Sequence, residues 1–299
     1  MTLAVGLVGV GPWGAHVLRD LRALGATVHG AVRSPESLER ATTGGCASIV
    51  ADPASLPECD GYVIANRTQS HLDAIDVLLP RGRPIFCEKP ISSDVERTKR
   101  LPRAAHELVF IMHKWRYHPG IIEFARIASS EEYGPVQGLR TLRLGWKNPH
   151  EGTNSLWVLA PHELSIALEI FGEVPELINA APDPMDADMG GIGYFRTSGG
   201  VPFVTEFSFG HPMRQRRLLM RCRDAALTID DSDYAAIIVQ REGANNSETV
   251  RISEDMPLLA ELRRFLAHLR GGPAPVSSFA DELKIITVLA QMEAAIART

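Results

Sequence analysis

The sequence has few cysteines and no long apolar run. Its four cysteines, Cys46, Cys59, Cys87 and Cys222, form no CxxC pair and have no histidine at metal-binding spacing, which argues against a zinc site and a disulfide framework. No segment approaches the roughly 18 uninterrupted apolar residues that a membrane helix needs. We therefore expect reduced thiols, no metal and a cytoplasmic protein with no membrane partner.

The chain also lacks an excess of basic charge. Its formal net charge is -5, which gives no general attraction to nucleic acid or to anionic lipid. The one basic cluster, Arg214, Arg216 and Arg217, is short and fits a solvated strand end better than a nucleic-acid patch. The start, "MTLAVGLVGVG", has no basic leading segment, which favours a first strand over a signal peptide.

Two domains are indicated by the 299 residues and by a change of pattern along the chain. In the first third, short apolar runs alternate with segments of helical period, which is typical of parallel strands joined by crossover helices. The predicted strands are 3–10, 27–32, 61–66, 84–88 and 108–113. We predict a doubly wound parallel sheet, a Rossmann domain, over residues 1–118.

From residue 138 onward the apolar runs are longer and alternate, which suits antiparallel strands. The predicted strands are 138–146, 191–198, 201–210, 216–223 and 235–242, followed by helices at 258–270 and 280–297. We predict an α+β domain with a large, mainly antiparallel open sheet over residues 119–299. The chain is thus of the α/β class.

The glycine motif "GVGPWG" follows the first strand and precedes a helix. Gly9, Gly11 and Gly14 have GxGxxG spacing, with Pro12 and Trp13 at the variable positions. Such a turn lets main-chain N–H groups approach a pyrophosphate at a helix N-terminus. We predict dinucleotide binding here, while Trp13 has the alternative role of a packing residue.

The end of the second strand favours NADP over NAD. An NAD site usually places a carboxylate there to hold the ribose hydroxyls, but the chain reads "GAVRSPES". Arg33 and Ser34 suit a 2′-phosphate through a charge-assisted hydrogen bond and a hydroxyl. The alternative is that Arg33 is a surface residue and Ser34 begins the next turn.

A buried strand ends on charged residues in "IFCEKP". In an open parallel sheet the carboxyl ends of the strands line the ligand crevice, so Lys89 would stand next to a nicotinamide ring. There it could donate to a substrate oxygen or exchange a proton. The alternative is a lysine at a domain surface.

Several motifs together resemble the Gfo/Idh/MocA oxidoreductases. They are "GLVGVGPWG", "VIANRTQSH", "CEKP", "HKWRYHPGI" and "LAPHELSIALEIFG", which cover about the first 172 residues. The resemblance implies an NAD(P)-binding domain, a C-terminal domain often used for oligomerisation and hydride transfer on sugars or cyclitols. It also implies that Lys89 lies beside nicotinamide and substrate and that the Lys89–Pro90 bond is cis. The alternating strands of the second half allow an apolar outer sheet face, so we expect a homodimer or homotetramer through the C-terminal sheet.

The resemblance extends the site, with departures. His162 matches a family histidine, but Val158 stands where the family has an aspartate, so we assign proton transfer to Lys89 and His162, with Glu163 as a substitute. "NRTQSH" places Arg67 and Thr68 where proline and asparagine would be. The predicted cofactor-binding residues are Gly9, Gly11, Pro12, Trp13, Gly14, Arg33, Ser34, Asn66, Thr68, His71, Glu88, Lys89 and Arg116.

The predicted substrate contacts come from the motifs above and from the segment 145–157. That segment is dense in Trp, Asn and His, which recognise polyols by stacking and hydrogen bonds, although a plain surface loop is an equal alternative. The residues are Lys89, Tyr117, Trp146, Asn148, His150, Trp157 and His162.

The combined prediction is an NAD(P)-dependent dehydrogenase or reductase that acts on a CH–OH or C=O group of a sugar, cyclitol or related small molecule. Two alternatives stay open. One is a redox-neutral, NAD-dependent glycosidase or lyase of the same superfamily. The other, motivated by Val158, is a dinucleotide-binding regulatory protein without chemistry.

Overall fold

The computed structural model describes residues 2–146, 154–230 and 233–298, which form two compact units. The first unit is Met1–Lys114 with Met256–Leu283, and the second is Trp115–Asp255 with Lys284–Thr299. This division differs from a linear boundary between residues 118 and 119. The reason is that the apolar face of a late helix, with Leu262 and Phe265, lies in the core of the first unit.

The first unit contains a six-stranded sheet in the order β3-β2-β1-β4-β5-β6, with every pair parallel. This is the doubly wound order expected of a Rossmann domain, so the predicted fold is confirmed. The strands are β1 Ala4–Val8, β2 Thr27–Ala31, β3 Ser48–Val50, β4 Gly61–Ile64, β5 Ile85–Glu88 and β6 Val109–Met112. Strand β3 was not predicted because it has only three residues, none of them buried.

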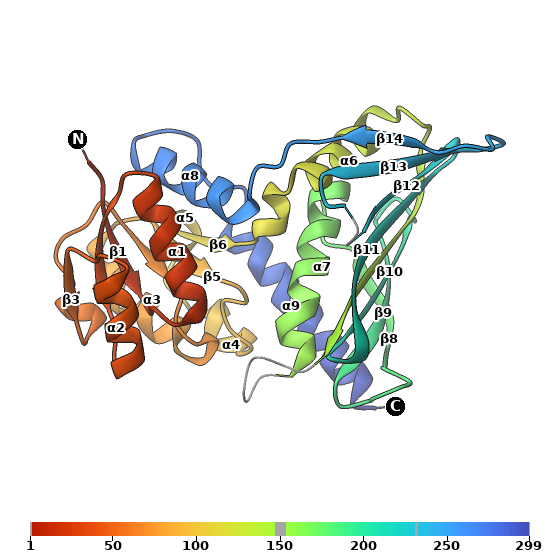
Figure 1. The fold of residues 1–299 in the computed structure, drawn as a ribbon. Helices are drawn as coiled ribbons and strands as arrows, with labels where there is room; N and C mark the ends of the chain where they lie inside the picture. The colour runs from red at the N-terminus through yellow and green to blue at the C-terminus, as the bar shows by residue number, and fades with distance from the viewer. Residues whose placement is uncertain (1, 147–153, 231–232, 299) are drawn as a thin grey trace. The chain divides into compact units, whose positions relative to one another are not determined.

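Helices cover both faces of this sheet (Figure 1). Val17, Leu18 and Leu21 of α1 and the apolar face of α8 pack into one core with β1, β2 and β5, and Phe265 stacks on Phe86 with ring centroids 5.0 Å apart. The helices are α1 Pro12–Ala23, α2 Pro35–Thr43, α3 His71–Leu78, α4 Val95–Lys99, α5 Ala105–Leu108 and α8 Pro257–Leu269, with 3₁₀ turns η1 Pro53–Ser55, η2 Thr68–Ser70, η3 Leu79–Arg81 and η4 Lys114–Tyr117.

The second unit contains an eight-stranded sheet in the order β14-β13-β12-β11-β7-β10-β9-β8. Every neighbouring pair is antiparallel except β7 with β10, which confirms the predicted mainly antiparallel sheet. The strands are β7 Val136–Trp146, β8 Glu176–Pro182, β9 Gly190–Arg196, β10 Pro202–Ser208, β11 Gly210–Cys222, β12 Ala225–Asp230, β13 Ala236–Arg241 and β14 Glu248–Arg251.

Helix α7, Ser155–Phe171, packs against β7, β9 and β10 and is buried along almost its whole length. It also packs against α6, Pro119–Ser130. Helix α9, Phe279–Ile296, begins in the first unit, and its residues from Lys284 onward belong to the second. Among the helices of the described ranges, none has the length and apolar character needed to cross a membrane.

Candidate active site

The carboxyl ends of the parallel strands gather most of the predicted cofactor residues at one edge of the first sheet. The glycine turn follows β1, Arg33 follows β2, Asn66 follows β4 and Lys89 follows β5. Ligands of open α/β sheets bind outside this edge, where the strand order reverses. In this sheet the reversal lies between β1 and β4.

The three glycines of the turn meet different geometric demands. Gly9 has φ of 90°, and a Cβ there would lie 2.6 Å from the Asn66 Cα atom. A Cβ at Gly14 would lie 2.2 Å from the Gly9 carbonyl oxygen, so helix and strand approach closely. A Cβ at Gly11 would meet open space, and Gly11 begins α1 without a side-chain cap. The helix N-terminus is therefore open to an anion, as a pyrophosphate site requires.

The end of β2 lies beside this turn because the Gly9 N–H donates to the Ala31 carbonyl oxygen at 2.9 Å. Arg33 is exposed. Ser34 is the N-cap of α2, where its hydroxyl accepts a hydrogen bond from the Ser37 N–H at 3.2 Å. Ser34 therefore has a structural role in starting the helix, while Arg33 supplies an exposed cation after the strand end that contacts the turn.

Glu88 joins the glycine turn to the end of β5. Its carboxylate accepts a hydrogen bond from the Trp13 indole N–H and another, at 3.0 Å, from the Lys89 main-chain N–H. The Lys114 ammonium lies 4.3 Å from the centroid of the Trp13 ring, a cation–π contact. Trp13 and Glu88, both predicted as cofactor residues, thus bind each other. Pro12 is the exposed first residue of α1, and Thr68 begins η2.

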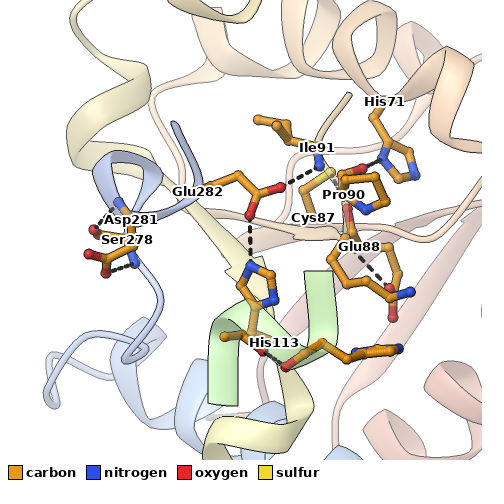
Figure 2. Close-up of polar contacts among 12 residues, drawn as sticks. His71, Cys87, Glu88, Pro90, Ile91, His113, Ser278, Asp281 and Glu282 are labelled. Atoms are coloured by element: carbon orange, nitrogen blue, oxygen red, sulfur yellow. Dashed lines mark hydrogen bonds and ion pairs between the residues drawn. The ribbon is translucent and has the colours of Figure 1, made fainter. Parts of the chain in front are cut away.

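His71 is buried behind this edge. Its Nδ1 lies 3.0 Å from the Pro90 carbonyl oxygen (Figure 2), and its Nε2 lies 3.1 Å from the Asn66 carbonyl oxygen. Burial lowers the pKa of His71, and a neutral ring donates only one of these two hydrogen bonds. His71 is therefore placed to hold the main chain of predicted site residues. The Lys89–Pro90 bond is cis, as the resemblance implied.

Two further acids of the first unit were missed from the sequence. Glu282, in the first turn of α9, contacts the Ile91 N–H and the His113 ring. Glu261, in α8, is buried with no hydrogen-bond partner for either carboxyl oxygen among the described residues. Burial, with a smaller contribution from Glu88, raises the pKa of Glu261 well above its usual range. Helical spacing marked both positions as ordinary helix residues, so no sequence signal pointed to them.

His162 lies in α7 of the second unit, half-buried, with its ring centroid 6.5 Å from that of Trp115. Val158, one turn earlier, is buried. The neighbouring Glu163 is buried and accepts a hydrogen bond from Nε of Arg143, a buried ion pair. Glu163 is thus held by a cation and is a poorer substitute for the missing aspartate than its position in sequence indicated.

Trp115 connects several groups in the second unit. The Arg143 guanidinium lies 4.7 Å from its ring, and the His118 ring stacks on it with centroids 5.3 Å apart. Its indole N–H and the Tyr234 hydroxyl are both buried without a hydrogen-bond partner among the described residues, which leaves donors available to a bound polar molecule. Neither residue was predicted.

The remaining predicted residues have mixed surroundings. Arg116 pairs with Glu169 of α7, with Nε 2.7 Å from the carboxylate, and Tyr117 is half-buried. Trp146 is 62% exposed, whereas Trp157 is buried and donates its indole N–H to Glu293 at 2.9 Å.

Two of the predicted substrate contacts, Asn148 and His150, lie outside the described residues. Lys89 belongs to the first unit and His162 to the second, so their convergence stays a prediction.

Comparison with known proteins identifies the first domain. Residues 3–113 match the model GFO_IDH_MocA, described as "Oxidoreductase family, NAD-binding Rossmann fold". Inositol 2-dehydrogenase of Paracoccus denitrificans (strain Pd 1222) is 26% identical over 180 residues, which are 56% of this chain and 52% of that protein. The alignments span about half the length of the first curated relatives.

Solved structures resemble the chain over its full length. UDP-N-acetylglucosamine 3-dehydrogenase GnnA from Acidithiobacillus ferrooxidans aligns with a TM-score of 0.83 at 20% identity, covering 100% of this chain and 99% of that one. Levoglucosan dehydrogenase, in complex with NADH and levoglucosan, aligns with a TM-score of 0.86 at 18% identity, covering 100% and 98%. At such identities these likenesses show the shared two-domain fold.

Proposed function

We propose that this chain, which belongs to the Gfo/Idh/MocA oxidoreductase family through its N-terminal NAD-binding domain, is an NAD(P)-dependent dehydrogenase or reductase. Its reaction is hydride transfer at a hydroxyl- or carbonyl-bearing carbon of a sugar or cyclitol. The substrate class rests on the curated relatives and solved neighbours, which are dehydrogenases of inositol and of sugars by name.

The observation that carries the proposal is the combination of an open glycine turn with a lysine at the same sheet edge. Gly11 leaves space where a side chain would block a pyrophosphate, and α1 presents its uncapped N-terminus. Lys89 follows β5, so it lies at the carboxyl edge of the sheet, outside which ligands of such sheets bind. A structural turn without a ligand has no need for the open position at Gly11.

The cofactor and the side chains have different roles in the proposed reaction. A bound nicotinamide cofactor supplies the hydride acceptor or donor. Lys89 donates a hydrogen bond to the reacting oxygen and exchanges its proton, and His162 is the second candidate for that proton because an imidazole titrates near neutral pH. Neither role requires an aspartate at position 158.

We favour NADP(H) over NAD(H). Arg33 is an exposed cation next to the glycine turn, and a guanidinium matches a 2′-phosphate in charge and geometry. Ser34 contributes less than its sequence position indicated because it caps α2. Separate titrations with NADPH and NADH test this preference, and tighter binding of NADH would contradict it.

Substitution of Lys89 by methionine tests the catalytic assignment. We expect Lys89→Met to lower kcat by about 100-fold or more, the usual contribution of a general acid or base, with cofactor Kd changed by less than about threefold. Steady-state kinetics and fluorescence titration of the cofactor measure the two effects.

The matched control for this variant is Lys99→Met, which removes an exposed lysine of α4 that pairs with Glu96. It should leave both constants unchanged, because an exposed ion pair contributes little. Full turnover of Lys89→Met would reject the catalytic role of Lys89.

A second candidate function is supported by Val158. A buried valine carries no proton, so a chain that binds the dinucleotide without chemistry is the alternative. Saturable NADPH binding with no turnover over a broad panel of sugars, cyclitols and their keto forms would favour it.

A further inference from the structure

Both ends of one peptide unit next to Lys89 are held by buried side chains. The Pro90 carbonyl oxygen lies 3.0 Å from His71 Nδ1, which donates to it in the tautomer that carries the proton on Nδ1. The Ile91 N–H donates to the Glu282 carboxylate at 2.8 Å. Figure 2 shows His71 and Glu282 on opposite sides of this peptide unit. We call these two side chains the Pro90–Ile91 clamp.

Glu282 is itself fixed in position. Ser278 and Asp281 form a reciprocal capping box at the start of α9, with N–H to side-chain oxygen distances of 3.2 and 3.1 Å (Figure 2). Ser278 pairs with Phe110 of β6, and the Ile111 N–H donates to the Ser277 carbonyl oxygen at 3.1 Å. The first turn of α9 is therefore attached to the edge strand of the sheet that carries Lys89.

The second oxygen of Glu282 accepts a hydrogen bond from His113 Nε2 at 2.7 Å, and both side chains are fully buried. A carboxylate in this surrounding is stabilised by the two donors it holds. If position 282 only had to fill space, an apolar side chain would do as well, because replacing a buried pair such as Glu282–His113 by apolar residues often preserves stability. Because Glu282 instead accepts hydrogen bonds from the Ile91 N–H and from His113, its role is to position the main chain at Ile91.

We propose that the Pro90–Ile91 clamp positions Lys89 for its reaction, with Glu282 and His71 as positioning residues. Three constraints then act on the backbone around Lys89. Its own N–H donates to Glu88 at 3.0 Å, the ring of Pro90 fixes φ of that residue, and the clamp fixes the next peptide plane. This inference rests on the proposed function, because it assumes that Lys89 is catalytic.

The first test measures the clamp without any turnover. In the protein without cofactor, Glu282→Leu removes the acceptor of the Ile91 N–H, and we expect hydrogen exchange of the Ile91 amide to accelerate by about tenfold or more. Glu282→Gln keeps one carbonyl oxygen toward that N–H, so its exchange should stay within about threefold of the parent rate. His71→Phe removes the side chain that contacts the Pro90 carbonyl oxygen, and we expect faster exchange of the Ile91 amide in this variant too. Its result does not depend on the folding of the Glu282 variants.

The second test measures turnover. We expect Glu282→Leu and His71→Phe to lower kcat by about tenfold or more while cofactor Kd changes by less than about threefold, with Glu282→Gln near the parent enzyme. The pH profile of kcat should shift in the two clamp variants, because a displaced Lys89 meets different surroundings. Tyr62→Phe is the matched control, since Tyr62 is a buried residue of β4 whose hydroxyl accepts one hydrogen bond, from Arg81 Nη1. This variant should leave kcat and its pH profile unchanged.

The outcomes separate this inference from the proposed function. Unchanged exchange at Ile91 in both Glu282→Leu and His71→Phe overturns the clamp, whatever the kinetics show. Faster exchange with unchanged kcat, in an enzyme that Lys89→Met disables, overturns the positioning role. Full activity of Lys89→Met rejects the catalytic role of Lys89 and with it any positioning of a catalytic group, while Ile91 exchange still reports whether the clamp itself exists.

Discussion

At the residue scale, three buried carboxyl groups of the first unit differ in their partners. Glu88 holds the Trp13 indole and the Lys89 N–H, and Glu282 holds His113 and the Ile91 N–H. Glu261 has no hydrogen-bond partner among the described residues. The "EKP" motif made Glu88 visible in the sequence. Glu261 and Glu282 acquire their surroundings only by tertiary packing, so their environment was not predictable.

The raised pKa of Glu261 predicts that the fold loses stability as the pH rises. Its pKa is raised in the folded protein from the usual value of about 4.5, so above that pH the folded state keeps a proton that the unfolded state has lost. We expect Glu261→Gln to raise the free energy of unfolding near pH 8 by about 1–3 kcal/mol and to have little effect near pH 5. Denaturant unfolding at both pH values measures this.

Glu39→Gln is the control for that change, since Glu39 is exposed on α2. A stability difference between the parent and Glu261→Gln that is the same at both pH values would show that the carboxyl group does not titrate as described.

At the element scale, two glycines of the turn between β1 and α1 are required for different reasons, Gly9 for folding and Gly11 for cofactor binding. A methyl group at Gly11 meets open space and its φ of -70° suits alanine, whereas a Cβ at Gly9 would overlap Asn66 at a φ of 90°. We expect Gly11→Ala to change the free energy of unfolding by less than about 1 kcal/mol and to raise cofactor Kd by about tenfold or more.

Gly9→Ala is the contrasting variant, because it should lower the stability of the first unit by about 2 kcal/mol or more. Thermal unfolding and cofactor titration distinguish the two positions. Normal cofactor affinity of folded Gly11→Ala would mean that no phosphate lies at this turn.

Helix α6 depends on a titratable cap. His118 Nδ1 accepts a hydrogen bond from the Gly120 N–H at 3.1 Å, and burial lowers the pKa of His118 to about 4. A histidine with a depressed folded pKa contributes stability above its unfolded pKa and loses it as the pH falls toward the folded value. We expect up to about 3 kcal/mol of stability to be lost between about pH 6.5 and pH 4.

His118→Asn checks this, because asparagine caps helices without titrating in that range. Its stability should fall less steeply with acid than that of the parent. His16→Asn, at an exposed histidine of α1, is the control and should leave the slope unchanged. Equal slopes for all three proteins would exclude His118 as the titrating group.

Most elements of both sheets were predictable because their residues show a clear apolar period. Of the described strands, four were missed. β3 has no buried residue, the four residues of β14 are all exposed, and β8 has a single buried residue. β12 was missed although its residues alternate between buried and half-buried. In the site, glycine geometry and the strand-end position of Lys89 followed from local sequence. The role of Ser34 as a helix cap and the burial of Trp157 against Glu293 depend on neighbours that the sequence does not identify.

At the scale of the whole molecule, the chain enters the first unit twice. Residues 256–283 return to it and bring α8, Glu261 and the clamp residue Glu282. The amphipathic period of α8 predicts a helix with one apolar face but not which sheet that face covers, so a linear domain boundary was the natural prediction. The C-terminal return thus completes the surroundings of Lys89 within the first unit.

The measurement that tests hydride transfer most directly follows deuterium from NADPH, labelled at both hydrogen positions of nicotinamide C4, into candidate keto-sugars and keto-cyclitols. We expect each molecule of oxidised cofactor to be matched by one molecule of alcohol product that carries the label at the reduced carbon, and Lys89→Met to suppress both together. Product formed without net oxidation of the cofactor, or bound NADPH that stays unreacted over the whole panel, would contradict the proposed dehydrogenase.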